Sequence, residues 1–335
     1  MSNAVKGAPS GDHQNYIVTF DGPDAAEKAA QAQAMLGLQG IAPNVLSAPK
    51  NGRLVVQITP DQVDALEKSG ARCYVDQEVT IPAPERLLNR SSPQLKVRDA
   101  LSGEGRFSVD THGADKLHAQ GYKGSRVDLC VVDTGIDGTH PDIPTIEQGN
   151  FDDVFTPAPF DPPTDGNSHG THCTGSAAGT QTVSGGKLGM APEVRLFGAK
   201  VLDDSGSGSF SSIMKGVEFA IEKAKNSDRP MVVSMSLGGT ARNPAADDPL
   251  VQMIEKATKE HGVLFVIAAG NSGPRANTIN TPGIAPSAIT VAAFDTRNTV
   301  SLDDDRVARF SSRGGTRRPS MDNKPDIGAN GVNEF

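Results

Sequence analysis

A carboxylate and an imidazole stand where nucleophilic hydrolysis would need them. Asp133 ends the apolar run 129–132 and is followed by Thr-Gly-Ile-Asp. His169 opens a stretch of small residues, His-Gly-Thr-His-Cys-Thr-Gly. An aspartate at the carboxyl end of a buried strand can hold an imidazole in one tautomer, and that imidazole can then act as a general base. The two residues therefore predict an orienting acid and a general base, two of the three parts of a nucleophilic triad.

Each of these residues also has a simpler interpretation. Asp133 alone would equally well cap the turn after its strand, and a single histidine is usually a satisfied polar residue. The closeness of His169, His172 and Cys173 in the sequence also suggests zinc. Zinc centres need further ligands at suitable spacing, and the sequence contains no Cys-x-x-Cys, so zinc is disfavoured.

A third polar group follows a later apolar run. Asn271 lies in Ala-Ala-Gly-Asn-Ser-Gly-Pro, directly after 263–267. An asparagine fixed between glycines at a strand end can aim its amide at a developing oxyanion, although these residues also form ordinary turns. Two glycine-rich segments, 206–208 and 236–239, are able to pair their backbones with an extended peptide. Taken alone, either segment would more often be a loop.

The elements that must position these groups alternate along the second part of the chain. Short β-branched strands are predicted at 126–132, 194–201, 230–236, 263–269 and 288–293, with helices at 209–226 and 246–261. This alternation predicts a parallel sheet with helices on both faces, an α/β fold. Functional sites in such folds form at the carboxyl ends of the strands.

The first part of the chain predicts a smaller α+β domain. Strands are expected at 15–21, 45–48, 54–58 and 71–81, and helices at 24–38 and 60–69. The order β-α-β-β-α-β is that of the ferredoxin-like unit. We divide the chain into a disordered N-terminus (1–14), this small domain (15–81), a linker with proline and glycine (82–109) and the α/β domain (110–335).

Composition limits the class of protein. The 335 residues are 36% hydrophobic and 21% charged, with a net charge of -8, which disfavours nucleic acid as a partner. Three cysteines argue against a disulfide framework. No stretch reaches the ~18 apolar residues of a membrane span, so we expect no membrane partner. The first thirty residues hold no apolar core of a signal peptide, and the localisation stays open.

In this order and on this strand pattern, the motifs resemble those of the subtilisin-like serine proteases. The cysteine after His-Gly-Thr-His resembles the proteinase K branch, in which a free thiol lies behind the histidine. The resemblance implies a three-layer catalytic domain at 110–335 and an inhibitory propeptide at 15–81. It implies Asp133 as the triad aspartate, His169 as the triad histidine and Asn271 as the oxyanion asparagine. The cleft residues that it implies are Gly206, Ser207, Gly208, Ser236, Leu237, Gly238, Ala269 and Gly270.

The resemblance also implies partners and cations. We expect protein or peptide substrates, the chain's own propeptide in the cleft until cleavage within about 80–110, a monomer and no organic cofactor. Structural calcium is the one expected ion: Asp142 matches one site, and the carbonyls of Pro286 and Ala288 with Asp326 match a second. Calcium needs six or more oxygen ligands, so a solvated or capping aspartate is an equal alternative.

The nucleophile segment of the family, Gly-Thr-Ser-Met-Ala, does not occur in the 335 residues. The segments 310–314 and 324–327 resemble landmarks that precede it. Ser320 is a superficial match, but Pro319 stands before it. We therefore expect a catalytic domain that is C-terminally incomplete and a chain that alone hydrolyses no peptide. The alternative function is a non-catalytic pseudoprotease, or an inhibitor or binding module of the propeptide type.

Overall fold

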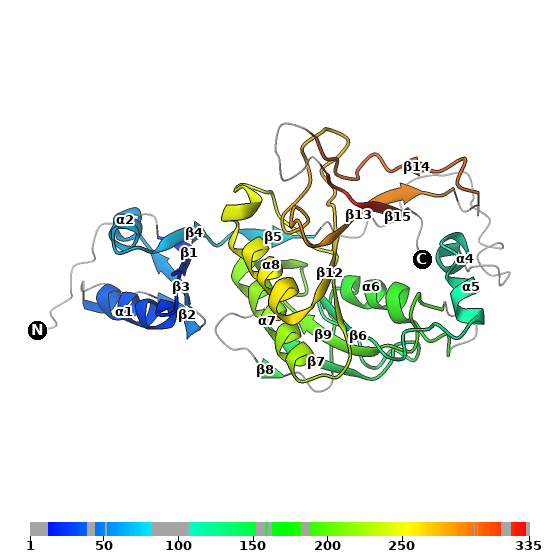
Figure 1. Cartoon of the computed structure of the whole chain (residues 1–335), viewed down its shortest axis with the longest axis horizontal. Coiled ribbons are helices and arrows are strands. Elements are labelled where there is room, and N and C mark those ends of the chain that lie inside the picture. Colours follow the sequence, from blue (N-terminus) through cyan, green and yellow to red (C-terminus); the bar gives the residue numbers. More distant parts are fainter. Residues whose placement is uncertain are drawn as a thin grey trace, which may run out of the picture. The chain divides into compact units, whose positions relative to one another are not determined.

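The computed structural model describes residues 13–38, 44–50, 52–81, 107–151, 158–159, 163–182, 188–297, 299, 301–315 and 323–332. The chain divides into two compact units, Met1–Gln77 and Glu78–Phe335 (Figure 1). Most of the predicted N-terminal segment 1–14 lies outside the described residues. The predicted linker 82–109 also lies outside them as far as residue 106.

The first unit is a four-stranded antiparallel sheet with two helices. Its elements are β1 (Gln14–Thr19), α1 (Ala25–Leu38), β2 (Asn44–Lys50), β3 (Arg53–Ile58), α2 (Pro60–Lys68) and β4 (Arg72–Val75). The strand order is β2-β3-β1-β4. Alternate residues of the strands pack on the helices, and the core includes Val18, Leu36, Leu54 and Leu66. The order predicted from the sequence is therefore the order in the structure.

The last predicted strand of this domain, 71–81, is in fact two strands. β4 ends at Val75, and β5 (Glu78–Thr80) belongs to the second unit. There β5 pairs antiparallel with β10 (Ser207–Ser209). The apolar alternation continues through Val79 and Ile81, both almost fully buried. Apolar and polar residues alternate without interruption through this segment. The sequence pattern therefore did not show that its first part pairs with β1 and its last part with β10.

The second unit is built on a mainly parallel sheet. Its strands are β6 (Asp128–Asp133), β7 (Ile146–Asn150), β8 (Ala158–Pro159), β9 (Arg195–Lys200), β11 (Met231–Met235), β12 (Leu264–Ala268), β13 (Ile289–Asp295), β14 (Arg306–Val307) and β15 (Ile327–Asn330). The order is β14-β13-β12-β11-β6-β9-β7-β8, with β15 on β13. Only β8 and β14 pair antiparallel among these described strands. The five predicted strands are confirmed as β6, β9, β11, β12 and β13.

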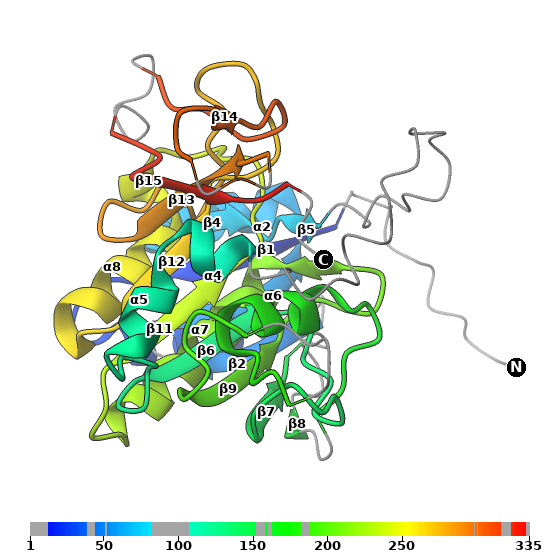
Figure 2. The ribbon, with the colours of Figure 1, turned by 90° about the vertical axis from the view of Figure 1, so that its right-hand side faces the viewer.

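Helices cover both faces of this sheet (Figures 1 and 2). The helices are α4 (Phe107–Thr111), α5 (Ala114–Ala119), α6 (His169–Ala178), α7 (Phe210–Lys225) and α8 (Pro249–His261), with a short 3-10 turn η2 (Ala245–Asp247). On one face Ala178 of α6 packs against Leu129 and Val131 of β6. On the other face Gly216 of α7 lies close to Val132. Every residue of β6 is therefore buried, as expected of a strand with helices on both sides.

The ends of the helices follow the local sequence. Ser209 Oγ accepts a hydrogen bond from the Ser212 N–H and caps α7. The buried Asp248 accepts from the backbone N–H groups of Leu250 and Val251 at 3.0 and 3.1 Å and caps α8. In the part of the chain that the structure describes, no helix has the length and apolar character needed to cross a membrane.

Candidate active site

The carboxyl edge of the sheet brings Asp133 and His169 together. Asp133 is the last residue of β6, and His169 is the first of α6. His169 Nδ1 lies 2.7 Å from Asp133 Oδ1; the aspartate side chain is 1% exposed and the histidine side chain 27%. Asp133 Oδ1 also accepts from the Thr134 N–H at 2.7 Å. With Nδ1 held by the carboxylate, Nε2 is the imidazole nitrogen that remains for proton transfer.

The surroundings shift the protonation of this imidazole. Burial alone would lower the pKa of His169, because it disfavours the charged ring. The hydrogen bond and the negative charge of Asp133, with a smaller contribution from Cys173, outweigh burial and raise the pKa of His169 above its ordinary value. A triad base must be neutral, so the contact with Asp133 moves the formation of that base toward higher pH.

The close approach of α6 to the loop after β6 depends on a glycine. A Cβ atom at Gly170 would lie 2.1 Å from the carbonyl oxygen of Gly135. The N–H of Gly170 instead donates to Thr134 Oγ1 at 2.9 Å. The small residues after His169 thus allow the helix to start directly against the strand end that carries Asp133.

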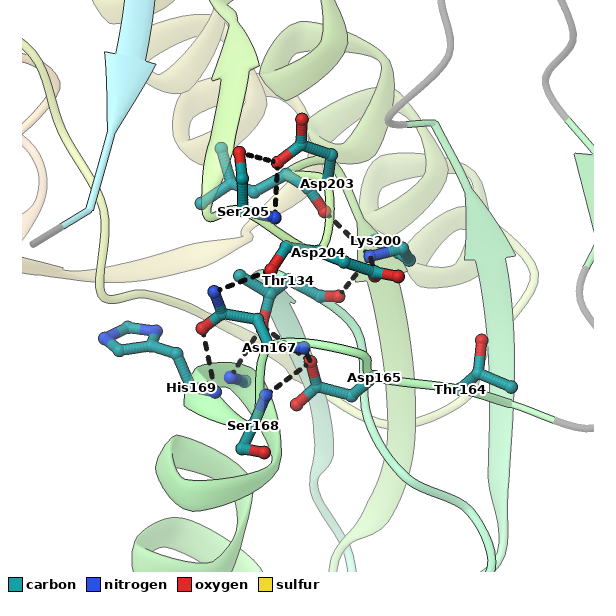
Figure 3. A network of polar contacts seen from close by, with 12 residues as sticks. Thr134, Thr164, Asp165, Asn167, Ser168, His169, Lys200, Asp203, Asp204 and Ser205 are labelled. Carbon is teal, nitrogen blue, oxygen red and sulfur yellow. Dashed lines mark hydrogen bonds and ion pairs between the residues drawn. The ribbon is translucent and has the colours of Figure 1, made fainter. Parts of the chain in front are cut away.

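Asp165 ties this helix start to the same loop (Figure 3). Its Oδ1 accepts from Thr134 Oγ1 at 3.0 Å, the Asn167 N–H at 3.0 Å and the Ser168 N–H at 2.9 Å. Its Oδ2 accepts from the N–H and the hydroxyl of Thr171 at 3.0 and 2.7 Å. Burial raises the pKa of Asp165, but these donors outweigh it and hold that pKa below its ordinary value. Asp165 thus links the loop that follows Asp133 with the helix that begins at His169.

Lys200, the last residue of β9, supports the loop from the other side. Its buried ammonium donates to the carbonyls of Thr134 and Leu202 at 2.7 and 3.0 Å and to Asp204 Oδ1 at 2.9 Å (Figure 3). Asn167 closes the network, because its amide donates to the Asp204 carbonyl at 3.1 Å and accepts from the His169 N–H at 3.3 Å. The loop after β6, the loop before α6 and the loop after β9 are thereby connected.

The supporting roles of Asp165 and Lys200 were not predicted from the sequence, although each residue has a sequence signal. Asp165 belongs to the short polar run Asp-Gly-Asn-Ser directly before His169, and short polar side chains near a helix start can accept from its backbone N–H groups. Lys200 lies within the predicted apolar strand 194–201, and a buried lysine requires polar partners.

Of the predicted cleft residues, Gly206, Ser207 and Gly208 lie against an extended segment of the chain itself. Gly208 pairs with Val79, and Ser207 with Thr80. The Ile81 N–H donates to the Gly206 carbonyl at 3.0 Å. This edge therefore pairs its backbone with an extended segment of the same chain, while its binding of substrate remains a prediction.

The second predicted wall, Ser236, Leu237 and Gly238, follows β11. Just beyond it, the Gly239 N–H donates to the Thr281 carbonyl at 2.9 Å. A Cβ at Gly239 would lie 3.2 Å from Phe210 Cε1 and 3.4 Å from Val79 Cγ2. Val79 is thus in contact range of Gly239 as well as paired with β10, so β5 lies between the two segments.

The predicted oxyanion residue, Asn271, is exposed on the loop after β12. Ala269 and Gly270 begin this loop. The Ala269 N–H donates to the Val291 carbonyl at 2.9 Å, and the Gly270 carbonyl accepts from the Ser312 N–H at 2.8 Å. Gly270 has a φ of 103°, in the region that favours glycine. The loop is therefore held from two sides, while the role of Asn271 remains a prediction.

Among the described residues, one group of three His, Cys or Asp side chains lies close enough together to hold a metal ion. The ligand atoms of Asp133, His169 and Cys173 lie within 4.8 Å of one another. Cys173 Sγ is 3.9 Å from His169 Nδ1, the nitrogen that Asp133 already binds. His172 is not part of this group, so the zinc set considered from the sequence does not form. All three cysteines are free.

The predicted calcium ligands lie in two separate places. Asp142 is buried in the loop between β6 and β7, and calcium binding there remains a prediction. At the second site, Lys324 Nζ donates to the Ala288 carbonyl at 2.6 Å and to Asp326 Oδ2 at 2.7 Å. Pro286, the remaining predicted ligand, is exposed.

A mainly parallel sheet between two helical layers, with an Asp–His pair at its carboxyl edge, is an arrangement typical of α/β folds that place their sites at the strand ends. The chain belongs to the Subtilase family, whose family model matches residues 124–335.

Individual relatives agree with this membership. The chain is 42% identical over 268 residues to "Serine protease AprX" of Bacillus subtilis (strain 168), covering 76% of this chain and 58% of that protein. It is 39% identical over 210 residues to "Subtilisin" of Bacillus pumilus, covering 62% of this chain and 68% of the relative. Among solved structures, "Sphericase" superposes with a TM-score of 0.54 at 36% identity, over 62% of this chain and 67% of that one. The chain spans between about half and two thirds of the length of the curated relatives it matches.

Proposed function

We propose that the protein is a serine endopeptidase of the subtilisin type, made as an autoinhibited precursor. The observation that carries this proposal is the 2.7 Å contact between His169 Nδ1 and the buried Asp133. In the proposed reaction, Nε2 of neutral His169 takes the proton of a serine hydroxyl while the serine oxygen attacks the peptide carbonyl. Asp133 stabilises the imidazolium, and Asn271 donates to the oxyanion. His169 then protonates the leaving amine, and water hydrolyses the acyl-enzyme by the same steps.

The proposed triad also requires a nucleophile. The 335 residues contain no Gly-Thr-Ser-Met-Ala segment. We propose that the serine lies outside these residues and that residues 1–335 alone hydrolyse no peptide. Without a nucleophile the covalent route is lost, and only binding and oxyanion stabilisation would accelerate the reaction over water.

An extended peptide is the substrate that the cleft supports best. Three residues of β10 already pair with a peptide strand, and antiparallel pairing with an exposed edge is sequence-tolerant because it uses backbone groups. We propose that substrate replaces β5 in this position. In the precursor, residues 78–81 then block the cleft until cleavage further along the chain releases them.

The test is hydrolysis of a fluorogenic peptide by the complete reading frame of the gene. His169→Ala should lower kcat/KM by at least about 10⁴-fold, and Asp133→Asn should also lower it strongly. His13→Ala, an exposed histidine of the first unit, is the matched control and should retain activity. A complete protein that binds peptides but never cleaves them would favour the pseudoprotease instead.

A further inference from the structure

A buried lysine lies where β15 joins the sheet. The side chain of Lys324 is 6% exposed. Its ammonium donates to the carbonyl of Ala288, the residue before β13, and to Asp326, the residue before β15. The Asp326 N–H donates to the Thr290 carbonyl at 2.9 Å, and the parallel ladder of the two strands begins at the next pair, Val291 with Ile327. Lys324 therefore joins the two strands at the start of their pairing.

These are two of the oxygens that the family resemblance assigns to a calcium ion, and they do not fit one here. Asp326 Oδ2 already accepts from Lys324 Nζ and from the Thr290 N–H, each at 2.7 Å. The Ala288 carbonyl accepts from the same ammonium at 2.6 Å. Calcium binds its oxygens at about 2.3–2.6 Å and needs at least six of them. An ion on these two oxygens would lie within a few ångströms of the ammonium, where two cations repel strongly.

We propose that the ammonium of Lys324 takes the place of a structural cation at this site, so that β15 is fixed on β13 without calcium. An ammonium donates up to three hydrogen bonds and is covalently attached, whereas a bound ion exchanges with solvent. Chelators can remove an ion but not a side chain. The pairing of β13 and β15 is therefore independent of calcium concentration, whatever ion the loop of Asp142 binds.

The first test replaces the ammonium with an uncharged side chain of similar length in the complete protein. In EDTA, Lys324→Met should lower the Tm by several degrees, because the carboxylate and carbonyl lose their donor. Millimolar calcium should then raise the Tm of Lys324→Met more than that of the wild type. The double variant Lys324→Met/Asp326→Asn should lose this extra calcium response, since the carboxylate ligand is gone.

The second test uses the wild type and stays informative if Lys324→Met fails to fold. Isothermal titration with calcium should find the same number of bound ions in the wild type and in Asp326→Asn. One ion fewer in Asp326→Asn would overturn the proposal, because the carboxylate would then be a calcium ligand despite Lys324. Two results with Lys324→Met would also contradict the proposal. One is a Tm in EDTA equal to that of the wild type. The other is a lowered Tm that calcium raises by no more than it raises the Tm of the wild type.

Discussion

The Asp133–His169 pair depends on residues that lie behind it and would not touch a substrate. Thr134 uses its backbone N–H to bind Asp133 and its hydroxyl to join Asp165 and the Gly170 N–H. Lys200 holds the carbonyl of Thr134. The acid and the base are therefore fixed by a buried polar network, and such a network is costly to leave partly satisfied.

The protonation of His169 gives the first prediction. A histidine NMR titration should find the pKa of His169 above the ordinary value of about 6.5, because Asp133 favours the imidazolium. Asp133→Asn should lower the pKa of His169 markedly, since burial is then opposed only by the smaller contribution of Cys173. The stability that the pair adds is fully present below about pH 6.5 and is lost as the pH rises through the raised pKa. An unchanged titration in Asp133→Asn would contradict this account.

Asp165 gives the second prediction, as a positioning residue. Asp165→Asn turns one acceptor oxygen into a donor that faces N–H or hydroxyl groups. We expect the complete protein to lose about 1–3 kcal/mol of unfolding free energy and kcat to fall at least about tenfold with KM little changed. A fall in kcat with an unchanged KM would indicate that His169 is misplaced, whereas general loss of structure would change both.

The control for Asp165 is Asp137→Asn. Asp137 also accepts from a backbone N–H and a hydroxyl, but both belong to Thr139 in its own loop and not to the helix start. Asp137→Asn should change the unfolding free energy by no more than about 0.5 kcal/mol, as for other surface substitutions. Equal losses of kcat in both variants would show that the link made by Asp165 has no special role.

At the scale of elements, the site exists because α6 starts against the end of β6. A small residue is needed where the backbones meet, at Gly170, whereas a Cβ at Gly175 in the same helix would have no neighbour within 4 Å. The two glycines therefore differ in packing while sharing the same helix.

This difference gives the third prediction. Gly170→Ala should destabilise the protein by about 1–3 kcal/mol, because the new methyl group meets the backbone carbonyl of Gly135. Gly175→Ala should be neutral or stabilising by up to about 1 kcal/mol, since alanine favours the helix. Urea denaturation of both variants measures the two free energies. If Gly170→Ala proved as harmless as Gly175→Ala, the close approach would not be a requirement.

The sequence predicted the long elements well and the short ones poorly. Central strands such as β6 and β12 are continuous apolar runs, so their burial is visible in the residues. β7, β8, β14 and β15 have few apolar residues or are too short for a period, and they form because a neighbouring strand edge is available. The position of Asp133 at a strand end predicted its contact with His169. The hydrogen bonds of Asp165 and Lys200 depend on loop geometry, which the periodicity of apolar residues in the sequence does not reveal.

At the scale of the whole molecule, the central feature is the pairing of β5 with β10, the edge that we propose binds substrate. Val79 is 1% exposed and lies close to Gly239, while Thr80 on the alternate face of β5 is exposed. The hold on this segment therefore rests on backbone pairing, on one buried aliphatic face and on a hydrogen bond between the hydroxyls of Thr80 and Ser207 at 3.2 Å.

The fourth prediction tests that hold. Val79→Asp buries a carboxylate against apolar atoms and should release β5, at a cost of a few kcal/mol. Hydrogen exchange at Gly208, which pairs with Val79, should then become faster, and the complete protein should show a shorter lag before activity. Thr80→Asp adds the same charge on the exposed face; it loses the hydroxyl contact with Ser207 but buries no charge, and it is the matched control. Equal exchange in both variants would contradict autoinhibition by β5.

The most direct test of the central claim is labelling with a serine-directed fluorophosphonate, with the labelled residue found by mass spectrometry. We expect the complete protein to be labelled at one serine in a Gly-Thr-Ser segment outside residues 1–335. Labelling should disappear in His169→Ala, because that serine needs its base. Residues 1–335 alone should stay unlabelled. A complete protein that takes up no label, or that is labelled equally well without His169, would contradict the assignment of a subtilisin-type triad.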